Sequence, residues 1–119
     1  MEEKANTLAE RFLDYGVAIL KLTMKLDASL SGKHVAGQLF RSGTSAGANY
    51  EEACGAESKA DFIHKLQIVL KELRESHYWL RLILKSALLQ DPAIPALIEE
   101  TKQLINIIAK SLITAKKKK

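Results

Sequence analysis

The chain has 119 residues, of which 47% are apolar and 27% charged, and this composition excludes general disorder and predicts one folded domain. Its formal net charge is +4, but four lysines end the sequence, and the other basic side chains equal the acidic ones in number. We therefore expect a charge-neutral body at residues 1–115 and a basic tail at residues 116–119. Such a tail either binds nucleic acid non-specifically or only keeps the C-terminus soluble.

The first predicted helix carries apolar residues at alternating spacings of four and three, which is typical of a helix packed along one face. These residues are Leu8, Phe12, Tyr15, Ile19, Leu22 and Leu26. Gly32 is well placed to end this helix in the left-handed conformation. The second helix is then expected at about residues 33–54, with Gly55 at its end.

The second predicted helix contains an unusual stretch of small residues at positions 38–55, QLFRSGTSAGANYEEACG. A phosphate-binding loop needs a preceding strand and the pattern GxxxxGK[ST], and neither is present. Gly43 and Gly47 lie instead in helical phase with Phe40 and Tyr50. Each interior glycine costs a helix about 1 kcal/mol, which is tolerable where a neighbouring backbone approaches closely. The stretch therefore predicts a thin helix pressed against a neighbour.

The third predicted helix begins after Ser58, which can cap it together with Asp61 three residues later. It extends to residue 88 or 89. One apolar seam follows its length, flanked by a second stripe, which indicates neighbours on two sides. The seam consists of Ile63, Leu66, Leu70, Leu73, His77, Leu80 and Leu84, and the flanking stripe of Phe62, Val69 and Ile83.

The fourth predicted helix begins after a break at QDPAIP, with Asp91 as its cap and Pro92 at the first helical position. Its apolar residues are Leu97, Ile98, Leu104, Ile105, Ile108 and Leu112. No sustained alternation of period two and no Asn-Gly hairpin turn occurs in the sequence. The chain is therefore predicted to be all-α, an antiparallel up-and-down four-helix bundle.

Candidate catalytic and metal-binding residues are few. Asp61 and His64 have the spacing of one half of a di-iron site, but the second pair is missing, so with Glu57 we expect a solvated capping cluster. His77 is either a general base or a hydrogen-bonded, half-buried core residue, and the second is expected because no nucleophile has a recognisable setting. Adjacent glutamates at 51 and 52 diverge by about 100° on a helix and cannot act as a catalytic pair. We predict no catalytic residue, metal, cofactor or small-molecule substrate.

Arg41, Asn49 and Glu52 form a polar trio along the small-residue helix. We expect them to fix register by hydrogen bonds, within the bundle or between subunits. The residues predicted at helix-packing or subunit contacts are Arg41, Ser42, Gly43, Ser45, Gly47, Asn49, Tyr50 and Glu52.

Basic residues spread along the third helix raise the alternative of nucleic-acid binding. They do not all share one face, and glutamates at 72 and 75 are interleaved, so a solvated, salt-bridged surface is expected. Tyr78 and Trp79 either stack on bases or belong to the core or an interface. If the protein binds RNA or DNA, the expected contacts are Lys65, Arg74, Arg81, Lys116, Lys117, Lys118 and Lys119.

Residues 38–83 resemble the core of a bacterial four-helix-bundle family whose founding members are encoded by intervening sequences inside 23S ribosomal RNA genes. The matching positions are Arg41, Ser42, Ser45, Asn49, Glu52, Ser58, Phe62, Glu72, Tyr78, Trp79 and Leu80. The resemblance implies a ring-like homopentamer. The chain is more distantly similar to accessory variability determinants of diversity-generating retroelements, which partner a reverse transcriptase and bind nucleic acid. The expected function is a non-enzymatic oligomeric scaffold or interaction protein, with a nucleic-acid-binding accessory protein as the alternative.

The expected location is the cytoplasm, without membrane attachment. No apolar run approaches the ~20 residues of a membrane span, and the acidic, polar N-terminus shows no secretory signal. The single cysteine, Cys54, cannot form an internal disulfide and is expected to be a buried thiol in a helix.

Overall fold

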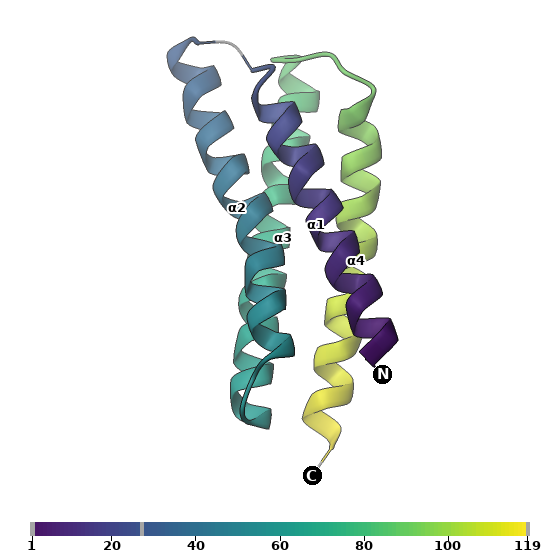
Figure 1. Cartoon of the computed structure of the whole chain (residues 1–119). Coiled ribbons are helices and arrows are strands. Elements are labelled where there is room, and N and C mark those ends of the chain that lie inside the picture. Colours follow the sequence, from purple (N-terminus) through teal and green to yellow (C-terminus); the bar gives the residue numbers. More distant parts are fainter. Residues whose placement is uncertain (1, 27, 119) are drawn as a thin grey trace.

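The computed structural model describes residues 2–26 and 28–118, with side chains from Thr7 onward. This part of the chain forms four α-helices, α1 (Glu2–Thr23), α2 (Leu30–Cys54), α3 (Lys59–Ser86) and α4 (Ala93–Lys117), and no strand. The helices alternate in direction along a bundle of 50 × 22 × 19 Å, with the start of α1 and the end of α4 at the same end (Figure 1). The predicted all-α fold with four helices is confirmed.

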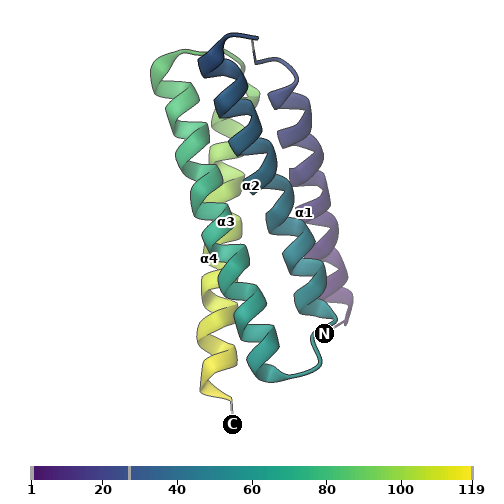
Figure 2. The same ribbon diagram turned by 90° about the vertical axis from the view of Figure 1, so that its left-hand side faces the viewer.

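Each helix packs against its sequence neighbours. α2 lies between α1 and α3, α3 also packs on α4, and a smaller contact between α1 and α4 closes the bundle (Figure 2). In the described chain, the backbones of α1 and α3 do not approach each other closely, and neither do those of α2 and α4, so each pair lies on a diagonal. Within the same residues, none of the helices is both long and apolar enough to cross a membrane.

The prediction that Gly32 ends the first helix is wrong. α1 ends at Thr23, and Gly32 lies buried in the first turn of α2. Ser29 explains the early start of α2, because its side chain accepts a hydrogen bond of 3.0 Å from the Gly32 N–H and so satisfies a free donor of the helix end. The described glycines all have negative φ, and Gly55, at the end of α2, has φ −98°.

The other helix ends follow the predicted capping chemistry more closely. The Ser58 hydroxyl accepts a hydrogen bond of 3.0 Å from the Asp61 N–H, which confirms the predicted cap of α3. Asp91 accepts a bond of 2.8 Å from the Ala93 N–H. The prediction that Pro92 is the first helical residue is wrong by one position, because α4 begins at Ala93. α3 ends at Ser86, slightly earlier than predicted, because Ala87 adopts the left-handed conformation with φ 56°.

The core runs along the bundle axis and draws on all four helices. On α3 the buried residues are Leu66, Val69, Glu72, Leu73, Ser76, Leu80 and Ile83. The predicted flanking stripe is therefore as central as the predicted seam, and Leu84, placed in the seam, is 47% exposed. The face is rotated because α3 packs on α2 and α4 at once.

One further prediction about α2 is wrong. Cys54 is exposed rather than buried, since Ala53 is the last residue of α2 that points into the core. Phe40 is 43% exposed, and the adjacent Leu39 takes the core position. α4 continues to Lys117, so the first two lysines of the predicted basic tail are helical. Lys118 is exposed, and Lys119 lies outside the described residues.

Candidate self-association groove and polar contacts

The small residues of α2 bring it close to α1, as the helical phase of the glycines predicted. A Cβ atom on Gly43 would lie 2.8 Å from Ile19 Cγ2 and 2.9 Å from Ile19 Cγ1. A Cβ atom on Gly47 would lie 3.3 Å from Phe12 Cβ. Tyr50, one turn further along α2, stacks on Phe12 with ring centroids 5.0 Å apart. These contacts confirm that the stretch is a helix pressed against a neighbour.

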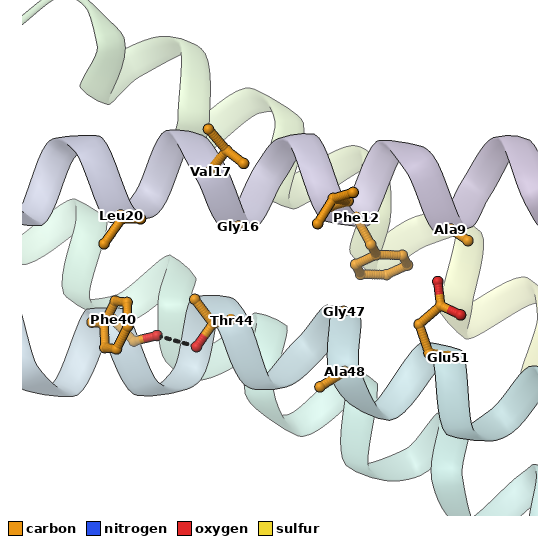
Figure 3. A pocket seen from close by; sticks show the side chains of 11 residues that line it. Ala9, Phe12, Gly16, Val17, Leu20, Phe40, Thr44, Gly47, Ala48 and Glu51 are labelled. Atoms are coloured by element: carbon orange, nitrogen blue, oxygen red, sulfur yellow. Dashed lines mark hydrogen bonds between the residues drawn. The ribbon is translucent and has the colours of Figure 1, made fainter.

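An apolar groove of about 430 Å³ runs along the outer surface between α1 and α2 (Figure 3). Leu13, Val17 and Leu20 line it from α1, and Phe40 and Ala48 from α2. The side chains that line the groove and remain well exposed are Leu13 at 60%, Val17 at 42%, Leu20 at 43% and Phe40 at 43%. Exposed apolar side chains gathered in one place mark a surface that another molecule covers.

Few polar side chains line the groove. The Thr44 hydroxyl donates a hydrogen bond of 2.7 Å to the Phe40 carbonyl of its own helix, so it is engaged (Figure 3). Glu51 supplies a carboxylate at one end. The arrangement suits an apolar side chain from a partner better than a polar substrate.

Sequence reasoning missed this groove, although α1 carries a visible signal for it. Leu13, Val17, Leu20 and Met24 repeat at spacings of four, three and four, one or two positions after residues of the core seam. Met24 is 76% exposed and extends the same apolar stripe. A second apolar stripe beside the core stripe predicts a second packing surface on one helix.

Arg41 ties α2 to α3. Its guanidinium donates a hydrogen bond of 2.9 Å to Glu72 and a second, shorter one to Glu75. Trp79 Nε1 also donates to Glu75, at 3.1 Å. Hydrogen bonding with Arg41 is the main reason that the pKa of Glu75 lies below its ordinary value.

The predicted polar trio does not form one network within the described residues. Asn49 donates to the Ser45 carbonyl of its own helix at 2.9 Å. Glu52 pairs with Lys65 at 2.7 Å, a second link between α2 and α3. Arg41 and Glu52 therefore each join the same two helices at different heights, and contacts of the trio between subunits stay a prediction.

A buried polar layer connects the four helices through one hydroxyl from each. The hydroxyl oxygens of Ser42 and Ser76 form a hydrogen bond of 2.8 Å, and those of Tyr15 and Thr101 form one of 2.7 Å. All four residues are buried. Burial raises the pKa of Tyr15 to about 12, against the opposing effect of the Thr101 and Ser76 hydroxyls. The sequence predicted a packing contact for Ser42 and a core position for Tyr15, but no role for Ser76 or Thr101. The spacing of Ser76 from Leu73 and Leu80 could have identified its core position.

His77 differs from its prediction as a hydrogen-bonded core residue. Its Nε2 atom is buried and has no hydrogen-bond partner among the described residues. Burial, together with the charges of Arg81 and Lys102, lowers its pKa. A neutral imidazole is therefore favoured here, and no described residue forms a hydrogen bond that would orient its Nε2 atom.

The other residues considered for metal or nucleic-acid binding do not gather at one site. Glu57 and His64 are exposed, and the described residues contain no group of three side chains that could hold a metal ion. Lys65 is engaged by Glu52, whereas Arg74 and Arg81 are exposed. Trp79 packs against the core, but Tyr78 is 56% exposed and contacts the Trp79 ring edge-on.

Comparison with known proteins places the chain in a family without assigning a reaction to it. A model of the family described as 23S rRNA-intervening sequence protein matches residues 5–110. A crystal structure from Bacteroides thetaiotaomicron, of a protein with unknown function from the S23 ribosomal protein family, is 32% identical in sequence. It superimposes with a TM-score of 0.83 over 92% of this chain and 97% of that chain. A comparison with curated proteins gave no match.

Proposed function

The chain belongs to the family of 23S rRNA-intervening sequence proteins, and we propose that it is a non-enzymatic, cytoplasmic scaffold or interaction protein that works as a homo-oligomer. The observation that carries the proposal is the apolar groove between α1 and α2. In a helical bundle whose core is already complete, a second apolar surface of this kind serves association.

A second copy of the chain is the occupant that best suits the groove. The groove is concave and lies on α1 and α2, whereas exposed apolar side chains occur on the other two helices, Leu84 at 47% on α3 and Ile113 at 55% on α4. A hollow on one face and exposed apolar side chains on another favour head-to-tail contacts, which close into a ring when the rotation between copies allows it. The resemblance described above suggests a ring of five.

The residues of the groove support a role without catalysis. Its lining offers one carboxylate and one hydroxyl, and that hydroxyl is bonded to its own helix. Acid–base or nucleophilic catalysis needs a reactive group with a second group that activates it. The groove provides no such pair among the described residues.

The test is the mass of the protein in solution. Val17→Glu places a charge in the groove at a side chain that is already 42% exposed, so the single chain should still fold. We expect the parent to sediment as an oligomer, five copies in the proposed ring, and the variant to dissociate, because burying an unpaired carboxylate is unfavourable.

Leu30→Glu is the matched control, since Leu30 is 88% exposed and does not line the groove. It should keep the mass of the parent. Circular dichroism should show equal helix content in all three proteins. A monomeric parent at high concentration, or a folded Val17→Glu protein of unchanged mass, would contradict the proposal.

A further inference from the structure

We infer that the outward face of α3 binds single-stranded nucleic acid. The surface consists of Lys71, Arg74, Tyr78, Arg81 and Lys85, called here the α3 strip. Successive members are three, four, three and four residues apart, so they lie in one line along the helix. With a rise of 1.5 Å per residue, the strip is about 21 Å long.

Within the described residues, the cations of the strip form no ion pair with a carboxylate. Lys71, Arg74, Arg81 and Lys85 are all exposed, and the ion pairs among the described residues use other basic side chains. The glutamates that interrupt the strip in sequence, Glu72 and Glu75, point to the α2 side of α3 and are paired there by Arg41. Contrary to what the sequence had suggested, the glutamates of α3 therefore do not neutralise the basic side chains of the strip.

The surroundings add to the positive charge of the strip. Lys102 of α4 lies near enough to act with Arg81 on His77. Lys71 stabilises the Glu75 carboxylate at longer range, but no ion pair joins the two. A row of uncompensated cations attracts the phosphate backbone, and its effect weakens as salt rises.

Tyr78 gives the strip a second means of recognition. Its ring is 56% exposed in the middle of the row of cations. The ring is held edge-on against Trp79, with centroids 5.0 Å apart and an interplanar angle of 79°. Trp79 is fixed in turn by Glu75 and by an edge contact with His34. A supported ring among cations matches the pattern by which proteins bind single strands, with bases stacked on aromatic rings and phosphates on basic residues.

Single strands fit these observations better than the alternatives. A duplex keeps its bases stacked inside, so the Tyr78 ring would gain nothing, and an acidic peptide would use the cations alone. The strip is no part of the self-association groove, because the groove is lined by residues of α1 and α2 and the strip lies on α3. All members of the strip belong to one chain, so the inference does not require assembly, although Leu84, proposed above as a contact between copies, lies beside Arg81 and Lys85.

The experiment measures fluorescence anisotropy of a labelled single-stranded RNA of about 12 nucleotides with the full-length protein. The variants are Arg74→Glu with Arg81→Glu, Tyr78→Ala, and Tyr78→Phe, which keeps an aromatic ring. The matched control is Lys21→Glu with Lys33→Glu, an identical charge change at exposed lysines of α1 and α2. A further variant replaces the lysines at 116–119 with glutamine, and salt is varied from about 50 to 200 mM.

We expect the parent to bind with a salt slope of about −3, since four phosphates on a single strand contribute about −0.7 each. The arginine double variant should lose about tenfold or more in affinity, and Tyr78→Ala about fivefold or more. Tyr78→Phe should bind within about twofold of the parent, because stacking needs the ring and not the hydroxyl. The control and the tail variant should each retain most of the affinity.

Four results would overturn the inference. The first is that the parent does not bind the RNA at the lowest salt, and the second is that the control and the arginine variant lose equal affinity. The third is that binding depends on the lysine tail alone, and the fourth is that the Tyr78→Ala protein binds the RNA like the parent. In the last case polyglutamate is added as a competitor. Competition as effective as that of RNA would identify the strip as a site for acidic peptides instead.

Discussion

The helical glycines of this protein differ in how closely a neighbouring helix packs against them. A Cβ atom on Gly43 would meet the buried, β-branched Ile19, whose γ carbons cannot move far. A Cβ atom on Gly37 would have no neighbour within 4 Å. One glycine is therefore required by packing, and the other only weakens its helix.

This difference predicts opposite effects of one substitution. Gly37→Ala should raise the free energy of unfolding by up to about 1 kcal/mol, the gain in helix propensity. Gly43→Ala should lower it by about 1–3 kcal/mol, because the added methyl group overpacks the contact with Ile19. Urea denaturation of both variants and the parent measures the effect. A Gly43→Ala protein as stable as Gly37→Ala would mean that α1 and α2 are not pressed together at this point.

At the scale of elements, close packing joins one pair of neighbouring helices, and ion pairs join two others. α1 packs closely against α2 where the glycines of α2 leave room for it. Charge joins α2 to α3 through Arg41, and α1 to α4 through Arg11, which donates two hydrogen bonds of 2.7 Å to Glu100. Paired Arg–carboxylate contacts have defined geometry and so help to set the height of one helix against another.

The Arg41 link predicts both a loss of stability and a dependence on pH. Arg41→Ala should lower the melting temperature, because Glu72 is buried and would lose its cation. The pKa of Glu75 is lower in the folded protein than its ordinary 4.5, so its contribution is present above that pH. It is lost as the pH falls from 4.5 through the folded pKa.

The measurement is the unfolding free energy of the parent and of Glu75→Gln against pH. The difference between them should be constant above about pH 5 and shrink below it. Arg81→Ala is the control for Arg41→Ala, since Arg81 is an exposed arginine outside the ion pairs of the described residues. An Arg41→Ala protein that keeps the assembly and melting temperature of the parent would remove the role assigned to this residue.

The elements were predictable from sequence to the extent that their causes are local. Apolar period and a capping hydroxyl identify α3, because Ser58 acts within one turn of its own helix. Gly32 has the residue type of a helix end, but Ser29 three residues earlier caps α2 and so places Gly32 in its first turn. The orientation of α3 about its axis depends on two other helices, so the setting of His77 and Leu84 could not be read from its own pattern.

At the scale of the whole molecule, the structure separates what holds one chain together from what remains for a partner. The core is complete within one chain and includes a hydrogen-bonded layer with one hydroxyl from each helix. A buried polar layer disfavours sliding of the helices, because any shift would leave hydroxyl groups unpaired. The exposed stripe of α1 contributes nothing to this core, which makes assembly and folding separable by mutation.

Gly16 allows that separation to be tested. It lines the groove, and a Cβ atom there would have no neighbour within 4 Å, so Gly16→Leu should fill the groove without disturbing its own chain. We expect the variant to dissociate in sedimentation experiments, because the added side chain occupies the space of the partner. At a low concentration at which the parent is also monomeric, the variant should be more stable by about 0.5–1 kcal/mol, because leucine favours the helix over glycine.

Gly37→Leu is the control, since Gly37 has similar open space but lies outside the groove. It should gain stability and keep the mass of the parent. Unchanged mass for Gly16→Leu would show that copies of this protein associate through another surface, if they associate at all.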